Sequence, residues 1–383
     1  MRFELATAGR IVFGAPLAEI GAELAAFEAP FFVVTGRDAE RAAALRPLLE
    51  ARGSASHLFP VSGEPTLTTA REGRAQARAH GCRSVIGIGG GSVLDAAKAI
   101  AALMTNDGDP LEYVEVIGRG RPLTQPAAPH VAIPTTAGTG SEVTRNAVLA
   151  SPEHRVKVSL RSAGMLPRLA WIDPALCLSM SPELTASTGM DALSQTMEAF
   201  VGNAPNPLTD PLCRDALARA ARALPRAHAQ GADLEARREM SFVSVVGGLA
   251  LANARLGAVH GFAAPLGGMF DAAHGALCAA LLAPVMAVNI AALRRREPAH
   301  PSLARYADVA RLLTGRPNAD AEDGAEWIAQ LCHGLGVRPL RAFGVSESDF
   351  DPASAKAEIA SSMKGNPIVL TSDERLEILR RAY

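Results

Sequence analysis

Aromatic side chains are scarce in this sequence of 383 residues, at 4%, so alanine, leucine and valine must fill most of its core. Neither charge dominates, because 38 lysines and arginines nearly balance 39 aspartates and glutamates and leave a net charge of −1. Without a basic excess, nucleic acid is not an expected partner. Hydrophobic residues make up 48% of the chain, and its length exceeds one ordinary domain, so we expect two globular domains.

Paired cysteines and long apolar runs are also missing. The five cysteines are scattered and contain no C-x-x-C pair, which favours a reducing compartment over a disulfide framework. The first residues carry no apolar stretch of signal-peptide length, and no run approaches ~18 uninterrupted apolar residues. We therefore expect a cytoplasmic protein without a membrane partner.

The first half of the chain alternates apolar runs with helical patterns, as βαβ units on a parallel sheet do. Strands are expected at residues 10–13, 30–36, 57–59, 84–88, 130–133 and 169–174, with an edge strand at 156–158, and helices at 17–27, 39–52, 67–80 and 93–104. From about residue 181 only helical patterns follow, at 188–201, 211–226, 234–254, 277–292, 303–313, 321–335 and 373–382. Ser187 or Thr188 is the expected cap of the first of these helices. The sequence thus predicts an α/β domain over residues 1–178, an all-helical domain over 179–383, and a site in the cleft between them.

A glycine-rich loop, Gly89-Gly90-Gly91-Ser92, joins the expected strand 84–88 to the helix after it. Backbone without Cβ atoms can approach a pyrophosphate closely, and the helix N-terminus offers free N–H groups. The spacing matches neither G-x-G-x-x-G nor a Walker loop, and the alternative is a tight turn that merely needs glycine. Asp95 is expected to be structural, because a carboxylate there would repel phosphate.

A second loop, from Pro134 to Glu142, follows the strand 130–133. Its density of hydroxyl side chains suits a cofactor better than a core; these side chains belong to Thr135, Thr136, Thr139 and Ser141. For any one threonine, the alternative is a hydroxyl bonded to nearby backbone. Lys157 is either a solvated side chain or a donor to a ribose.

The helical half contains candidate metal ligands. Asp191 and Gln195 stand four residues apart and therefore point to one side of their helix. His260 and His274 lie farther on, in apolar, glycine-rich runs. A carboxylate, an amide and two imidazoles that converge would form an open divalent-metal site. The alternative is a pair of structural histidines.

Taken together, these motifs resemble the iron-containing (group III) alcohol dehydrogenase family. The matching segments run in family order along nearly the whole chain: residues 89–92 with Asp95 and Lys98, 134–142, 173–174, 189–193, 260–261 with 265–268, and 274–275. The resemblance implies a dehydroquinate-synthase-like fold, with NAD or NADP bound by the N-terminal half. It also implies a divalent metal, Fe²⁺ or Zn²⁺, bound by the helical half.

The family binds its metal through one aspartate and three histidines. Its aspartate maps to Asp191 and two of its histidines map to His260 and His274, whereas the remaining histidine position holds Gln195. An amide oxygen is a poorer donor than imidazole for iron or zinc, so weaker metal binding is expected. Ala264 stands where the family often has a histidine near the nicotinamide, which removes one candidate proton relay.

The expected function is a metal-dependent, NAD(P)-linked alcohol dehydrogenase, or an aldehyde or ketone reductase in the reverse direction. Its partner would be a small-molecule alcohol, and the family implies a homodimer or larger homo-oligomer. One alternative is a metal-independent reductase resembling maleylacetate reductases, for which Arg145 could hold an acidic substrate. The other is a catalytically degenerate nucleotide-binding member.

The choice of cofactor depends on Gly36. In NAD-preferring members of the family an aspartate commonly stands at this strand end, where it binds the ribose hydroxyls and repels the extra phosphate of NADP. Gly36 removes that repulsion, and Arg37 could pair with a 2′-phosphate. Asp38 argues the other way, since a small shift of the turn could bring its carboxylate to the ribose. We expect NADP to be accepted at least as well as NAD.

Overall fold

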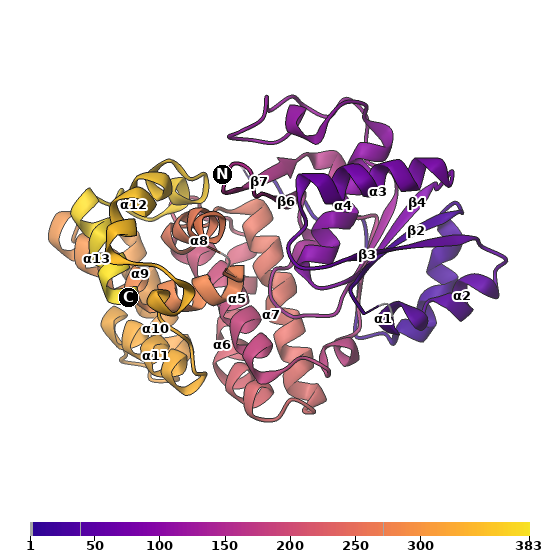
Figure 1. The fold of residues 1–383 in the computed structure, drawn as a ribbon. Coiled ribbons are helices and arrows are strands. Elements are labelled where there is room, and N and C mark those ends of the chain that lie inside the picture. Colours follow the sequence, from indigo (N-terminus) through magenta and orange to yellow (C-terminus); the bar gives the residue numbers. More distant parts are fainter. Residues whose placement is uncertain (1–2, 39, 271) are drawn as a thin grey trace. The chain divides into compact units, whose positions relative to one another are not determined.

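The computed structural model describes residues 3–38, 40–270 and 272–383 (Figure 1). The described chain forms two compact units. An α/β unit comprises Ala6–Thr136 and Gly140–Cys177, and a helical unit comprises Leu178–Tyr383 with Ala137–Thr139 and residues 3–5. The chain changes unit after Cys177, and the sequence places the change after residue 178.

A six-stranded sheet forms the centre of the α/β unit, in the order β1-β8-β5-β4-β2-β3. Its strands are β1 (Ile11–Phe13), β2 (Phe31–Gly36), β3 (Ser56–Val61), β4 (Ser84–Gly89), β5 (His130–Pro134) and β8 (Leu169–Ile172). All its neighbouring pairs are parallel, which confirms the predicted βαβ organisation.

Alternate side chains of β2 enter two different cores of this unit, one on each face of the sheet. Phe31 and Val33 pack with η1 (Leu17–Ala26), α1 (Glu40–Ala43) and α2 (Arg46–Glu50). Phe32 and Val34 pack with α3 (Leu67–Ala79) and α4 (Gly91–Thr105). Helices on both faces explain why β2 is apolar along its length rather than alternating with polar residues (Figure 1).

Two local predictions for this unit were incomplete. The helix expected at 39–52 is divided into α1 and α2, because Pro47 has no N–H for an intrahelical bond and stands in the first turn of α2. Residues 156–158 belong to β7 (Val156–Arg161), which pairs antiparallel with β6 (Asn146–Ser151) in a separate hairpin. The sequence reading missed β6, whose alternating burial fits a strand with one face in a core.

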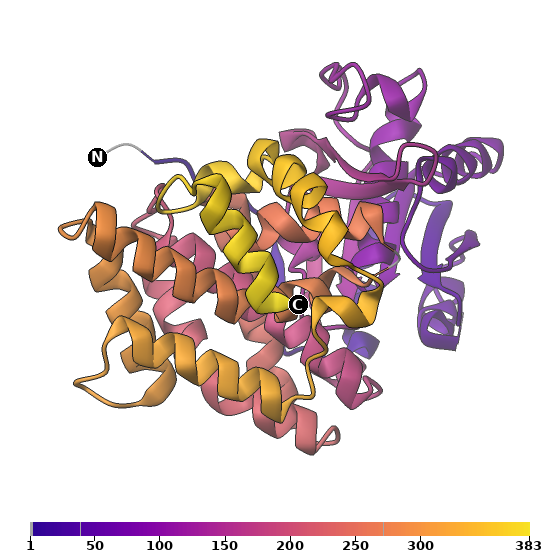
Figure 2. The ribbon, with the colours of Figure 1, turned by 60° about the vertical axis from the view of Figure 1, so that its left-hand side comes forward.

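The helical unit is a bundle (Figure 2). Its helices are α5 (Pro182–Val201), α6 (Thr209–Ala229), α7 (Leu234–Asn253), α8 (Ala258–Met269), α9 (His274–Arg296), α10 (Pro301–Thr314), α11 (Ala321–Gly334), α12 (Phe350–Ile359) and α13 (Ser372–Ala382). α8 and α12 were not predicted; Pro265 and several glycines in α8 weaken its helical pattern, and packing overrides them. α5 contacts α6, α7 and α9, so it lies at the centre of the bundle.

α9 is more apolar than the sequence reading anticipated. By length and composition it would be able to cross a membrane, with a mean hydropathy of 2.2 over its most apolar window. However, 67% of that window is buried inside the protein, where α9 packs against α5, α8, α11 and α13. This is the behaviour of a core helix.

Candidate metal centre and cofactor loops

α5 begins at Pro182, so the prediction of Ser187 or Thr188 as its cap was wrong. The Ser181 hydroxyl accepts a backbone N–H of the first turn at 3.2 Å, and Pro182 occupies a position where its missing N–H costs nothing. Asp191 consequently stands in the third turn of a buried helix. A carboxylate there requires partners, because burying an unpaired charge is costly.

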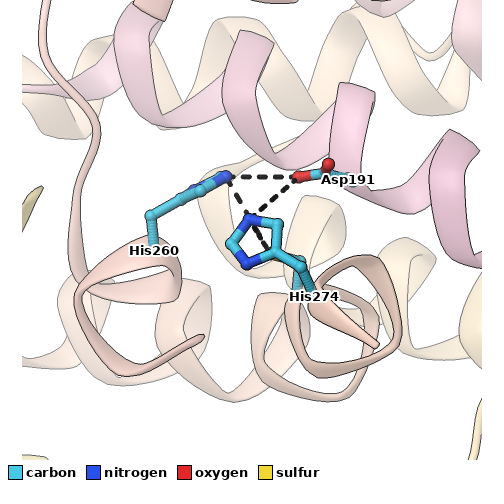
Figure 3. A group of neighbouring side chains, drawn as sticks. Asp191, His260 and His274 are labelled. Atoms are coloured by element: carbon cyan, nitrogen blue, oxygen red, sulfur yellow. Dashed lines mark hydrogen bonds and ion pairs between the residues drawn. The ribbon is translucent and has the colours of Figure 1, made fainter. Parts of the chain in front are cut away.

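The partners of Asp191 come from two other helices. His260 lies on α8 and His274 is the first residue of α9 (Figure 3). A Cβ built on Gly275 would stand 2.6 Å from the carbonyl oxygen of Ser187, so only glycine lets the start of α9 approach α5 this closely. The glycine after His274 therefore helps to bring its imidazole to the aspartate.

Three of the four side chains predicted as ligands, Asp191, His260 and His274, converge. Asp191 Oδ1 lies 3.2 Å from His260 Nε2 and 3.8 Å from His274 Nε2. Asp191 and His260 are buried, whereas the His274 side chain keeps 31% of its surface exposed. Of these three side chains, His274 is therefore the one that solvent or a small molecule can reach.

A second carboxylate orients His260. Glu198 stands two helical turns after Asp191 and accepts a hydrogen bond from His260 Nδ1 at 2.7 Å. Its other oxygen accepts the backbone N–H of Val259 at 2.6 Å, in the first turn of α8. With Nδ1 engaged in this way, His260 presents Nε2 to Asp191, as a carboxylate-supported metal ligand does.

Cys278 is a fourth member of the cluster that the sequence reading missed. It follows His274 by one helical turn, and its Sγ lies 3.6 Å from His274 Nε2 and 3.9 Å from His260 Nε2. Together with Asp191, these residues offer ligand atoms that all lie within 4.8 Å of one another. The i, i+4 spacing from His274 was the available signal.

The charged groups of the cluster shift one another's pKa values. Burial acts to raise the pKa of Asp191, but the hydrogen bond from His260 and the charge of His274 outweigh it and lower that pKa. Burial acts to lower the pKa of His260, but its interactions with Cys278 and Asp191 outweigh it and raise that pKa well above the usual range. Asp191 thus favours a positive charge, such as that of a protonated imidazole or a metal ion, between it and the two histidines.

Gln195, the fourth predicted ligand, is buried one turn after Asp191 and donates a side-chain hydrogen bond to it. Its Oε1 lies 3.2 Å from where a Cβ on Gly247 of α7 would stand. Among the described residues this oxygen has no hydrogen-bond partner. The structure therefore brings Gln195 to the cluster with the donor side of its amide toward the aspartate.

The glycine-rich loop stands where β4 meets α4. Gly90 is the residue before α4, so the loop leads directly into the free N–H groups of a helix N-terminus. A Cβ on Gly89 would stand 2.6 Å from the Val93 side chain, so glycine allows the strand and the helix to pack closely here. Gly90, Gly91 and Ser92 thus have the predicted strand–loop–helix setting.

The predicted residues of the second loop differ in their surroundings. Thr135 is buried and donates its backbone N–H to Gly89 at 2.9 Å, and a Cβ on Gly90 would touch Thr136 at 3.3 Å. These two threonines therefore border the glycine-rich loop. Thr139 lies in the segment that belongs to the helical unit.

Ser141 and Lys157 have protein partners. The Ser141 hydroxyl donates to Asp95 at 2.5 Å, and the other Asp95 oxygen accepts the N–H of Val148 at 2.9 Å. These contacts agree with the structural role expected for Asp95. Lys157, on the β6–β7 hairpin, is ion-paired with Glu64 at 3.1 Å, so it is not a solvated side chain.

Gly36 is the last residue of β2, and a Cβ built on it would meet no heavy atom within 4 Å. Arg37 is exposed and lies 3.4 Å from the Ser62 hydroxyl. Asp38 accepts the backbone N–H of Glu40 at 3.0 Å, at the start of α1. The Asp38 carboxylate is therefore engaged by its own turn.

Comparison with known proteins agrees with this architecture. The family model described as iron-containing alcohol dehydrogenase matches residues 8–174, and the C-terminal model of the Fe-containing alcohol dehydrogenase family matches residues 185–383. The chain belongs to the iron-containing alcohol dehydrogenase family. It is accordingly an oxidoreductase that acts on CH–OH groups, and the family implies NAD(H) and an iron-type metal.

Individual members of the family are similar over most of the chain. 1,3-Propanediol dehydrogenase of Klebsiella pneumoniae is 37% identical over 84% of this chain and 82% of its own length. The crystal structure of a 1,3-propanediol oxidoreductase superposes with a TM-score of 0.91 at 32% identity, over the whole of both chains. A sulfoacetaldehyde reductase from Bifidobacterium kashiwanohense, solved in complex with NAD⁺, gives a TM-score of 0.87 at 29% identity, over 100% of this chain and 99% of its own.

The side chains of this iron-containing alcohol dehydrogenase fit a divalent metal. A tetrahedral ion with bonds of about 2.0–2.3 Å holds its ligand atoms about 3.3–3.8 Å apart. Four separations between donor atoms of the cluster, 3.2, 3.8, 3.6 and 3.9 Å, lie close to that range. Carboxylate, imidazole and sulfur donors also suit iron and zinc.

Proposed function

We propose that this protein is a metal-dependent alcohol dehydrogenase that uses NAD or NADP, with Asp191, His260 and His274 as metal ligands. The observation that carries the proposal is the convergence of these donors from three helices onto one point (Figure 3). A divalent ion there would supply Lewis-acid chemistry toward an alcohol or carbonyl oxygen. Overall, the alcohol loses a hydride to the nicotinamide and a proton to solvent and becomes an aldehyde or ketone.

The protein's own side chains have separate tasks in this proposal. Asp191 is the carboxylate ligand of the site, and Glu198 holds His260 in the tautomer that leaves Nε2 free for a ligand bond. The exposed side of His274 is where the substrate oxygen would enter. Ala264 has no proton-transfer group, so a chain of waters or the ribose hydroxyl of the cofactor would have to carry the proton away.

On the α/β unit, we propose that the pyrophosphate of the cofactor binds at Gly90, Gly91 and Ser92. A helix N-terminus after a buried strand and the absence of Cβ atoms support this assignment. Thr135 and Thr136 border that loop, and contacts of Thr139, Ser141 and Lys157 with the cofactor remain predictions. The cytoplasm remains the proposed location, and the five cysteines, all within the described residues, are free thiols.

A substrate screen tests this function. Purified, metal-loaded protein would be offered primary alcohols, diols and hydroxy acids with each cofactor, and NAD(P)H absorbance would be followed. Oxidation of at least one class is expected. Nucleotide binding without turnover of any alcohol, or of any aldehyde in reverse, would instead favour the degenerate alternative.

The cofactor preference is expected to change at Gly36. The open space around it lets Gly36→Asp introduce a carboxylate without a clash, and that carboxylate would repel a 2′-phosphate. The ratio of kcat/KM with NAD to that with NADP should rise at least ~10-fold. Arg37→Ala is the companion variant, which should raise KM for NADP and leave NAD unaffected. A preference for NAD of about 100-fold or more in the unmutated protein, about 3 kcal/mol, would contradict the proposal.

We further propose that the protein is a homodimer, because members of the family often form dimers or larger assemblies. The helical unit also exposes large apolar side chains, such as Leu212 on α6 and Leu208 just before this helix. Light scattering at micromolar concentration should give about twice the mass of one chain. A monomer under those conditions would refute it.

A further inference from the structure

We propose that the Cys278 thiolate is a fourth metal ligand in this chain and replaces the histidine that the family resemblance places at position 195. The inference rests on the metal site of the proposed function and assigns a residue to it that the family's aspartate-and-histidine pattern does not contain. It concerns how this chain compensates for Gln195.

The position of Cys278 carries the proposal. Its Sγ lies within 4 Å of the Nε2 atoms of both His260 and His274, and Cys278 is completely buried. A zinc–thiolate site has a sulfur-to-metal bond of about 2.3 Å, which corresponds to sulfur-to-nitrogen separations near 3.5 Å. The thiol therefore already stands at ligand distance from its neighbours.

Gln195 does not occupy a ligand position as the structure has it. Its amide donates to Asp191, and its oxygen lies toward Gly247 on α7. The amide thus supports the aspartate through a hydrogen bond. Among the described His, Cys, Asp and Glu side chains of the cluster, the sulfur of Cys278 is the one potential metal ligand besides Asp191, His260 and His274. Loss of an imidazole at 195 leaves a coordination position that this sulfur can take.

A thiolate changes the chemistry of the site. One carboxylate and one thiolate neutralise a divalent ion, whereas one carboxylate with three imidazoles leaves a charge of +1 in a buried place. Thiolates also favour zinc, cobalt and iron over harder ions such as Mg²⁺ and Mn²⁺. The site should therefore prefer Zn²⁺ and Co²⁺ and should be sensitive to thiol oxidation.

Cobalt spectroscopy tests the proposal without an activity assay. Co²⁺-loaded protein is expected to show a thiolate-to-cobalt charge-transfer band in the near ultraviolet. Cys278→Ala should lose this band and bind metal at least ~10-fold more weakly. Cys332→Ala is the matched control, because Cys332 is a half-buried thiol on α11 outside the cluster, and it should keep the band.

A rescue variant separates a ligand role from a packing role. Adding Gln195→His to Cys278→Ala should restore metal affinity at least ~10-fold without restoring the band. Stoichiometric Co²⁺ without a thiolate band in the unmutated protein would overturn the proposal and leave the proposed function intact. Absence of any Co²⁺ binding would overturn both. An unchanged circular dichroism spectrum of Cys278→Ala would confirm that this variant folds. If it did not fold, Cys278→Ser would be used instead and checked in the same way.

Discussion

Replacing His274 with alanine is expected to give a folded protein that holds no metal after dialysis and has lost at least ~1,000-fold in kcat/KM, about 4 kcal/mol. The imidazole lies 3.8 Å from Asp191 and 3.6 Å from Cys278, and it is the most exposed member of the cluster. Removing it takes away a ligand at the side where the substrate would enter. Metal analysis and steady-state kinetics measure the two effects.

A matched histidine variant controls for general effects of the substitution. His333 lies exposed near the end of α11 and outside the metal cluster, so His333→Ala should keep both metal and activity. Retention of a full complement of metal by His274→Ala would show that this histidine is not a ligand. Loss of activity with metal retained would instead assign it to substrate binding.

The second large effect is expected at Glu198. Glu198→Gln keeps the shape of the side chain but removes the negative charge that His260 Nδ1 and the Val259 N–H share. Because charge-assisted hydrogen bonds contribute about 1.5–3 kcal/mol each, the free energy of unfolding should fall by roughly that amount. Metal affinity should fall ~10–100-fold, since His260 is no longer held in orientation.

Chelator competition and thermal unfolding measure these changes. Glu235→Gln is the control, because Glu235 pairs with Arg238 on the surface of α7, where such pairs contribute little. If Glu198→Gln bound metal as tightly as the unmutated protein, orientation of His260 by this carboxylate would not matter for the site. If the stability fell but the metal affinity did not change, Glu198 would serve only as a cap of α8.

The sequence predicts best what is local. The apolar run 31–35 identifies a buried strand by itself, and the order of strand, loop and helix around Gly89 to Ser92 could be predicted because these elements follow one another directly. The start of α5 was misplaced because Ser187 and Thr188 have the same hydroxyls as a true cap. Only the structure shows that Thr188 bonds back to the Leu184 carbonyl inside a continuing helix.

Long-range pairings could not be read from the sequence. The ion pair of Lys157 with Glu64 joins a hairpin to a loop that is distant in the sequence, and no local sequence pattern predicts it. The residue types of Asp191, His260 and His274 suggested that they converge, and the family resemblance supported it, but no local pattern gives the distances between them. Cys278 was missed because a lone buried cysteine is an ordinary core residue until its distance to two imidazoles is known.

The central claim is that catalysis depends on a metal at Asp191, His260 and His274, and metal depletion tests it most directly. Protein as purified should contain about one metal ion per chain. Chelation should abolish alcohol oxidation, and Zn²⁺ or Fe²⁺ should restore it in proportion to the metal bound. Full activity in protein stripped of metal would contradict the account and would favour a metal-independent reductase.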